Sequence, residues 1–184
     1  MGATTYRLAS AAVGPWSPVM AACLDLDAVA SHWTGASMRD LLPARPWVDV
    51  VLRRGRSIGG VRHLRRADVE VRIHTSTNLT SSDVVHDGPI PVTSVARTLM
   101  DVAALVPADL SPKALREAID VAVDRGLATD PWLWWVLAER RCRGRNGVTN
   151  FEDALRPGRG WDPPRAGWSA RCCGCSTPAA FPCR

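Results

Sequence analysis

Four of the six cysteines lie close together near the carboxyl end of this 184-residue chain, where they could hold a metal ion or form disulfides. A Cys-Cys-x-Cys cluster with one later cysteine is compatible with a thiolate zinc site or a disulfide knot. The spacing is poor for zinc because two adjacent cysteines rarely both reach one tetrahedral ion. We therefore expect no metal site and no cofactor here; the four cysteines are Cys172, Cys173, Cys175 and Cys183.

The segment 156–184 that carries these cysteines has neither helical nor strand periodicity, and a shifted reading frame explains it. Back-translated with GC-rich codons and moved back one base, residues 168–184 (WSARCCGCSTPAAFPCR) can read LEREVLRLLDAGGFPVP, an amphipathic helix with a Gly-Gly stop. Residues 161–167 (WDPPRAG) shift likewise to LGPTESG, a helix-capping pattern. We interpret the tail as out of frame from around residues 155–160, which makes its cysteines accidental. Stop codons in the shifted frame of the gene, or the lack of such a helix, would contradict this interpretation.

Six arginines surround a glycine-containing loop between two predicted strands. Guanidinium groups pair well with phosphate oxygens, so this loop could contact nucleic acid such as DNA. No aromatic residue is interleaved to stack on bases, and we do not expect the loop to read sequence. The alternative is a solvated loop whose charge is partly offset by Asp68 and Glu70. The expected nucleic-acid-binding residues are Arg53, Arg54, Arg56, Arg62, Arg65 and Arg66.

The rest of the chain contains no recognisable catalytic motif, and we predict no catalytic residue and no enzyme activity. It has no Gly-x-Ser-x-Gly elbow, P-loop, dinucleotide-binding glycine pattern or His-Glu-x-x-His. The four histidines fall on separate elements; His74 and His86 could approach each other across a sheet, without nearby carboxylates, as a structural pair. Arg97 and Asp101 have the spacing of an ion pair within a helix.

Three tryptophans close to one another form the second candidate site. On a helix, Trp132 and Trp135 share a face while Trp134 points elsewhere. Aromatic anchors are favoured at protein interfaces, so we predict that Trp132, Trp134 and Trp135 bind a partner. The alternative is that all three cap a small core.

These candidate residues sit on a regular pattern of strands followed by helices. Period-two alternation predicts strands at 47–52, 69–74, 84–86 and 90–92, with the Arg/Gly loop between the first two. Apolar spacing and caps predict helices at 17–26, 31–41, 95–106, 112–125, 132–141 and 148–155. The fold class is therefore α+β: a small, mainly antiparallel sheet packed by helices, a helical C-terminal half and a disordered tail.

Bulk properties exclude a membrane-spanning helix. No apolar run approaches eighteen residues. The net charge of +5 comes almost entirely from arginine, which favours nucleic acid only mildly. The N-terminal region faintly resembles a lipoprotein signal, but Gly14, Pro15 and Pro18 interrupt it, so we expect a cytoplasmic protein without membrane contact.

Several segments resemble the central region of AbiEi-type antitoxins of type IV toxin–antitoxin systems, common in actinobacteria. They are 6–9 (YRLA), 30–36 (ASHWTGA), 87–104 (DGPIPVTSVARTLMDVAA) and 115–127 (LREAIDVAVDRGL), and the match covers about residues 6–155. The resemblance implies a plan in which a DNA-binding winged helix precedes this α+β domain and a very-short-patch-repair-like nuclease domain often follows it. We find neither part in these 184 residues and therefore expect a truncated protein.

The resemblance also sets the expected boundaries and partner. Residues 1–15 are a remnant strand and linker, 16–155 the AbiEi-like domain, and 156–184 the out-of-frame tail. The partner it implies is a nucleotidyltransferase-like toxin. We expect an antitoxin-like or transcription-regulator-like protein that binds a protein and nucleic acid; the alternatives are a truncated nuclease-related protein and a nonfunctional gene remnant.

Overall fold

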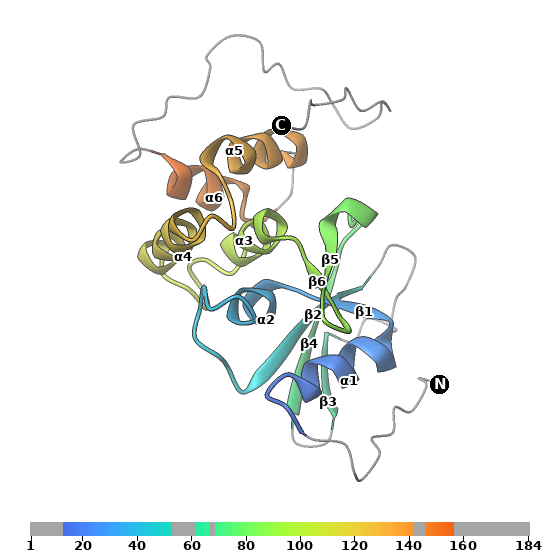
Figure 1. Ribbon diagram of the computed structural model, residues 1–184. Coiled ribbons are helices and arrows are strands. Elements are labelled where there is room, and N and C mark those ends of the chain that lie inside the picture. The colour runs from blue at the N-terminus through green and yellow to red at the C-terminus, as the bar shows by residue number, and fades with distance from the viewer. Residues whose placement is uncertain (1–12, 53–61, 67–68, 142–145, 157–184) are drawn as a thin grey trace.

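The fold is α+β, as the sequence predicts, with six strands in one sheet and a helical C-terminal half (Figure 1). The computed structural model describes residues 13–52, 62–66, 69–141 and 146–156. The predicted disordered tail lies outside these residues except for Arg156, and so does most of the predicted N-terminal linker. None of the described helices is long and apolar enough to cross a membrane.

The first half of the chain supplies the sheet and two helices. Its elements are α1 (Ser17–Leu26), β1 (Ala28–Ala30), α2 (His32–Ser37), β2 (Trp47–Leu52), β3 (His63–Arg66), β4 (Val69–Thr75), the 3-10 turn η1 (Ser81–Asp83), β5 (Val84–Asp87) and β6 (Ile90–Thr93). The strands lie in the order β3-β4-β2-β1-β6-β5. The pairs β1–β2, β3–β4 and β5–β6 are antiparallel, whereas β1–β6 and β2–β4 are parallel. The sheet is thus mixed and mostly antiparallel.

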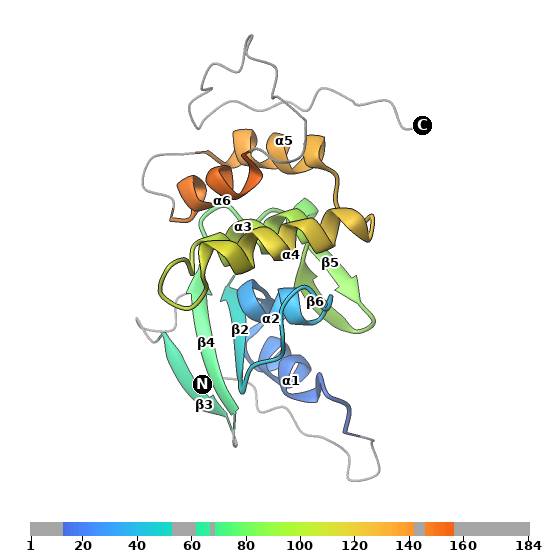
Figure 2. The same ribbon diagram turned by 90° about the vertical axis from the view of Figure 1, so that its left-hand side faces the viewer.

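The two faces of the sheet are covered differently. Alternate residues of the central strands pack with α1 into one apolar core that includes Val48, Val50, Val71 and Ile73. The opposite face of β2 carries Trp47, Asp49 and Val51, and α2 packs over part of it. In Figure 2, β3 lies at the margin of the sheet, away from the helical layer.

The second half forms a helical layer at one end of the sheet. Its helices are α3 (Val95–Ala103), α4 (Pro112–Asp124), α5 (Asp130–Arg140) and α6 (Val148–Leu155). They share a second apolar core with α2, built on fully buried side chains such as Leu99, Leu115, Leu133 and Phe151. Figures 1 and 2 both show α3 between the sheet and the outer helices α5 and α6.

One short strand was missed, and two helices end earlier than predicted. The strand β1 was not predicted because three residues, AVA, are too short to show alternation. The helix expected at 31–41 ends at Ser37 as α2, and the one expected at 95–106 ends at Ala103 as α3. In both cases the chain leaves the helix through further turns, which apolar spacing does not distinguish from helix.

Candidate binding surfaces

The predicted basic loop is partly an edge strand. Arg53, Arg54 and Arg56 lie outside the described residues, Arg62 precedes β3, and Arg65 and Arg66 belong to it. The prediction of a continuous loop is wrong for 63–66 because an edge strand tolerates polar residues, since one edge and often one face meet water. Here Leu64 packs towards the α1 core while Arg65 is exposed. Nucleic-acid contact by the six arginines stays a prediction.

The tryptophan-containing segment forms α5, and its outward face carries two of the three indoles. Thr129 caps the helix by accepting a hydrogen bond from the Trp132 amide, 3.4 Å away. Trp132 is 36% exposed and Trp135 43%, while Trp134 packs against the helical core. The prediction that Trp132 and Trp135 share one helix face while Trp134 points elsewhere is therefore confirmed. The alternative in which all three tryptophans cap the core is wrong.

The buried side of α5 fixes these indoles in place. Leu133, Val136 and Leu137 are buried in the helical core, so the helix cannot rotate without exposing them. The outward face continues one turn past Trp135 to Glu139, which is exposed. No ion pair joins Glu139 to another described residue. The face thus combines two exposed aromatic rings with an uncompensated carboxylate.

The histidines are arranged differently from the prediction. His74 and His86 do not meet: His74 is on β4 and His86 on β5, with three strands between them. His74 instead stacks on His32, with ring centroids 3.6 Å apart. Its Nε2 lies 2.9 Å from Oδ1 of Asp49, so the pair does have a carboxylate beside it. The sequence signal for this contact is the acidic residue at the centre of the apolar strand WVDVVL.

Asp49 is a buried carboxylate whose partners come from three elements. It is 2% exposed; its backbone N–H donates to Thr34 Oγ1 at 2.8 Å, and Trp47 Nε1 donates to Oδ2 at 3.2 Å. A buried charge needs such partners to offset the loss of hydration. These contacts link β2, β4 and α2. They give the Asp49–His74 pair a structural role in packing these elements together.

Trp33 and Trp47, which lie beside Asp49 and His74, make cation–π contacts with arginines. The guanidinium carbon of Arg45 lies 4.3 Å from the ring centroid of Trp33 and 5.3 Å from that of Trp47. The guanidinium carbon of Arg72 lies 3.9 Å from the Trp47 ring. Cations bind the faces of indole rings in this way. The sequence analysis missed this aromatic support for the basic region because Trp33 and Arg45 lie outside the arginine-rich loop.

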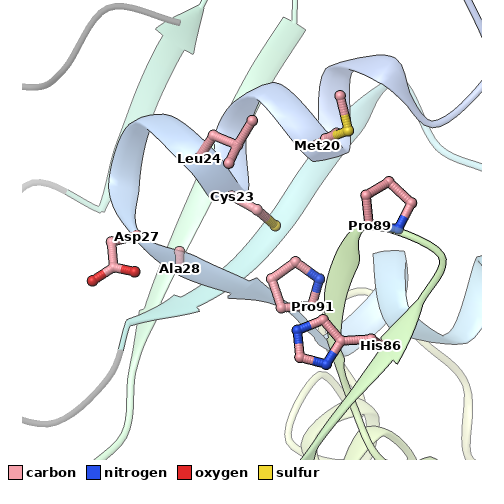
Figure 3. A pocket seen from close by; sticks show the side chains of 8 residues that line it. All are labelled: Met20, Cys23, Leu24, Asp27, Ala28, His86, Pro89 and Pro91. Carbon is pink, nitrogen blue, oxygen red and sulfur yellow. The ribbon is translucent and has the colours of Figure 1, made fainter.

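A cavity of about 240 Å³ lies between α1 and the β5–β6 hairpin (Figure 3). Met20 and Cys23 of α1 face His86, Pro89 and Pro91 of the hairpin across it. Burial raises the pKa of the Cys23 thiol to about 12, against a smaller lowering by a backbone hydrogen bond at Ala30. The sulfur therefore stays a thiol at neutral pH, and the cavity has no activated nucleophile.

We expect the Cys23 thiol of the folded protein to resist alkylation. Because thiolate is the reactive form, a raised pKa and 3% exposure should slow its reaction with iodoacetamide at pH 8 by at least about tenfold relative to the unfolded chain. Peptide mapping by mass spectrometry separates Cys23 from the other cysteines. Equal labelling of Cys23 with and without denaturant would contradict this assignment.

Comparison with known proteins adds no assignment to these surfaces. No protein-family model matches the chain, and its sequence matches no curated protein. Within the described ranges, no group of three or more histidine, cysteine, aspartate or glutamate side chains could hold a metal ion. The tail cysteines lie outside these ranges.

Proposed function

We propose that this chain is an antitoxin-like or regulator-like protein that acts by binding a protein partner, without catalysis, and that the outer face of α5 makes the contact. The observation that carries the proposal is the exposed pair Trp132 and Trp135. The resemblance of residues 6–155 to AbiEi-type antitoxins also supports a function in binding a protein partner. It makes a nucleotidyltransferase-like toxin the first partner to test.

The physical basis is the free energy available from covering the two indoles. Tryptophan is enriched among interface residues that dominate binding, because it buries a large rigid surface and loses little side-chain entropy. The inward residues of α5 are already packed, so the helix needs no rearrangement to present Trp132 and Trp135. Preorganisation of this kind lowers the entropic cost of association.

Titration calorimetry with a purified nucleotidyltransferase-like toxin, the class of partner that the resemblance implies, tests the proposal. Replacing Trp132 and Trp135 together by alanine should weaken binding by about 2 kcal/mol or more, roughly thirtyfold in Kd. Leu24→Ala is the matched control, because Leu24 is an apolar side chain 57% exposed on α1. The affinity of this variant for the toxin should stay within about twofold of wild type, since single exposed apolar residues are common on protein surfaces.

Each outcome of this titration decides one part of the proposal. If the wild-type chain does not bind the toxin-like protein, the antitoxin assignment is wrong. If it binds and the tryptophan variant binds equally well, α5 is not the contact. Loss of binding in the Leu24→Ala variant as well would show a general effect on folding, which circular dichroism of the same samples detects.

A further inference from the structure

The outer face of β2, β4 and β3 carries charged and aromatic side chains in register. Leu64, Val69, Val71 and Ile73 point to the α1 core, so the residues between them point to the opposite side. We call this side the polar face; its polar and aromatic residues are Trp47 and Asp49 of β2, Glu70, Arg72 and His74 of β4, and His63 and Arg65 of β3.

The register places the groups of the polar face in rows across the strands. Trp47 pairs with Glu70 and Glu70 with Arg65, so these three side chains form one row. Arg65 therefore lies two strand spacings, about 10 Å, from Trp47. The guanidinium carbon of Arg45 lies near the Trp47 end of this row, 5.3 Å from the centroid of that ring.

Two arginines at this face have no carboxylate partner among the described residues. Arg45 and Arg65 are exposed, and neither of them forms an ion pair with a described residue. The Glu70 carboxylate is held by Arg72 Nε at 3.1 Å and His63 Nδ1 at 3.2 Å. These hydrogen bonds, that of Arg72 first, keep the pKa of Glu70 below its usual value.

The remaining carboxylates are engaged too. Arg72 also lies 3.7 Å from Asp109, and Asp49 is buried against His74. The guanidinium groups of Arg45 and Arg65 are therefore the strongest anion-binding groups that the described residues of the polar face and its rim offer.

Arg45 is additionally held by two fixed rings. Trp33 Nε1 donates to the Pro43 carbonyl at 2.7 Å, and Trp47 Nε1 donates to Asp49, so neither indole is free to turn. A guanidinium supported by an indole loses less entropy when it binds a second group than a free one does. An unpaired nucleobase can stack on a guanidinium plane, whereas the bases of a duplex are not accessible in this way.

We propose that the polar face, with Arg45 at its rim, binds single-stranded nucleic acid: Arg65 pairs with a backbone phosphate, and Arg45 contacts a phosphate or an unpaired base. The occupant follows from two guanidinium groups without ion pairs, which select an anionic ligand, and from the indole support of one of them, which selects accessible bases. This site lies on different elements from α5 and goes beyond the proposed protein contact.

Fluorescence anisotropy with the full chain and labelled oligonucleotides tests the proposal. The probes are a twelve-nucleotide oligo(U), the equivalent oligo(dT) and a twelve-base-pair DNA duplex, each at several salt concentrations. The wild type should bind both single strands more tightly than the duplex. The slope of log K against log salt should lie between about −0.7 and −1.4, for one or two phosphate contacts to a single strand.

The variants separate a defined site from general attraction. The double variant Arg45→Glu, Arg65→Glu should weaken single-strand binding by about tenfold or more and make the salt slope shallower. The single variant Arg45→Lys keeps the charge but not the planar group, and should weaken binding by about threefold. Arg116→Glu on α4 is the control, because Arg116 is exposed. This substitution changes the net charge by the same amount as each of the two substitutions in the double variant.

Three results would overturn the proposal. One is that the double variant binds as tightly as wild type. Another is that Arg116→Glu lowers log K by half or more of the decrease seen in the double variant, which would mean that net charge alone drives binding. The third is a preference for the duplex. The relative affinities of oligo(U) and oligo(dT) identify RNA or DNA as the natural ligand.

Discussion

Replacing Arg97 by alanine is expected to lower the free energy of unfolding by about 3–5 kcal/mol, the effect of removing one partner from a buried ion pair. Arg97 is 3% exposed on α3, and its Nε donates to both carboxylate oxygens of Asp101 at 2.9 and 2.7 Å. Its terminal nitrogens reach the Asn78 carbonyl at 3.2 Å and Ser76 Oγ at 3.1 Å. The variant loses all of these hydrogen bonds at once.

The loss extends beyond α3 because the same guanidinium ties down the segment after β4. Arg97 lies 3.6 Å from Asp83, which Arg140 of α5 also contacts at 2.7 Å. Without Arg97 the buried side chains of Asp83 and Asp101 have fewer hydrogen-bond and ion-pair partners, and burial of polar groups without partners is costly. Chemical denaturation followed by circular dichroism measures the change.

Lys113→Ala supplies the control for Arg97→Ala. Lys113 and Glu117 form an exposed pair with the same spacing, their side chains 87% and 62% exposed. Its loss should change stability by less than about 1 kcal/mol, because solvent screens an exposed pair. Similar losses in both variants, or a loss below about 1 kcal/mol for Arg97→Ala, would contradict the structural role of the buried network.

Gly147→Ala should destabilise the fold by about 3 kcal/mol or more, through backbone strain and a direct clash. Gly147 has a φ of +84° at the start of α6. A Cβ there would lie 2.5 Å from the backbone nitrogen of Ala104 and 2.8 Å from the Ala103 carbonyl carbon. Relief requires α6 to move away from α3, which would open the core around Phe151.

The control for Gly147→Ala is Gly88→Ala in the β5–β6 turn. Gly88 also has a positive φ, +57°, but an added Cβ there meets nothing within 4 Å. That variant should lose about 1–2 kcal/mol from the left-handed conformation alone. Urea denaturation of both variants gives the difference, and equal losses would show that the contact between α6 and α3 is looser than described.

The helices were predictable from the sequence because each carries its own local signals. The Ser111-Pro112 start and the stripe of Leu115, Ile119 and Ala122 identify α4 without reference to any other segment. The same spacing rule separated the exposed Trp132 and Trp135 from Trp134. Local periodicity is sufficient to predict a helix and its buried face where that face packs against one apolar core.

The strand arrangement was not predictable in the same way, because pairing depends on contacts distant in sequence. Charged residues hid β3, although Leu64 occupies an inward position of the strand. Parallel pairing of β2 with β4 brings His74 beside Asp49, and α2 brings His32 onto it. Periodicity contains no information about which strand is the neighbour, and so the polar face could not be assembled from the sequence.

Amide hydrogen exchange of the chain, alone and with the nucleotidyltransferase-like protein, tests the proposed function most directly. Partner binding through α5 predicts slower exchange in residues 130–140 of the complex and unchanged exchange in α1 and β3. Protection confined to other elements, or no protection at saturating partner, would contradict the proposal that this protein acts through the exposed tryptophan face of α5.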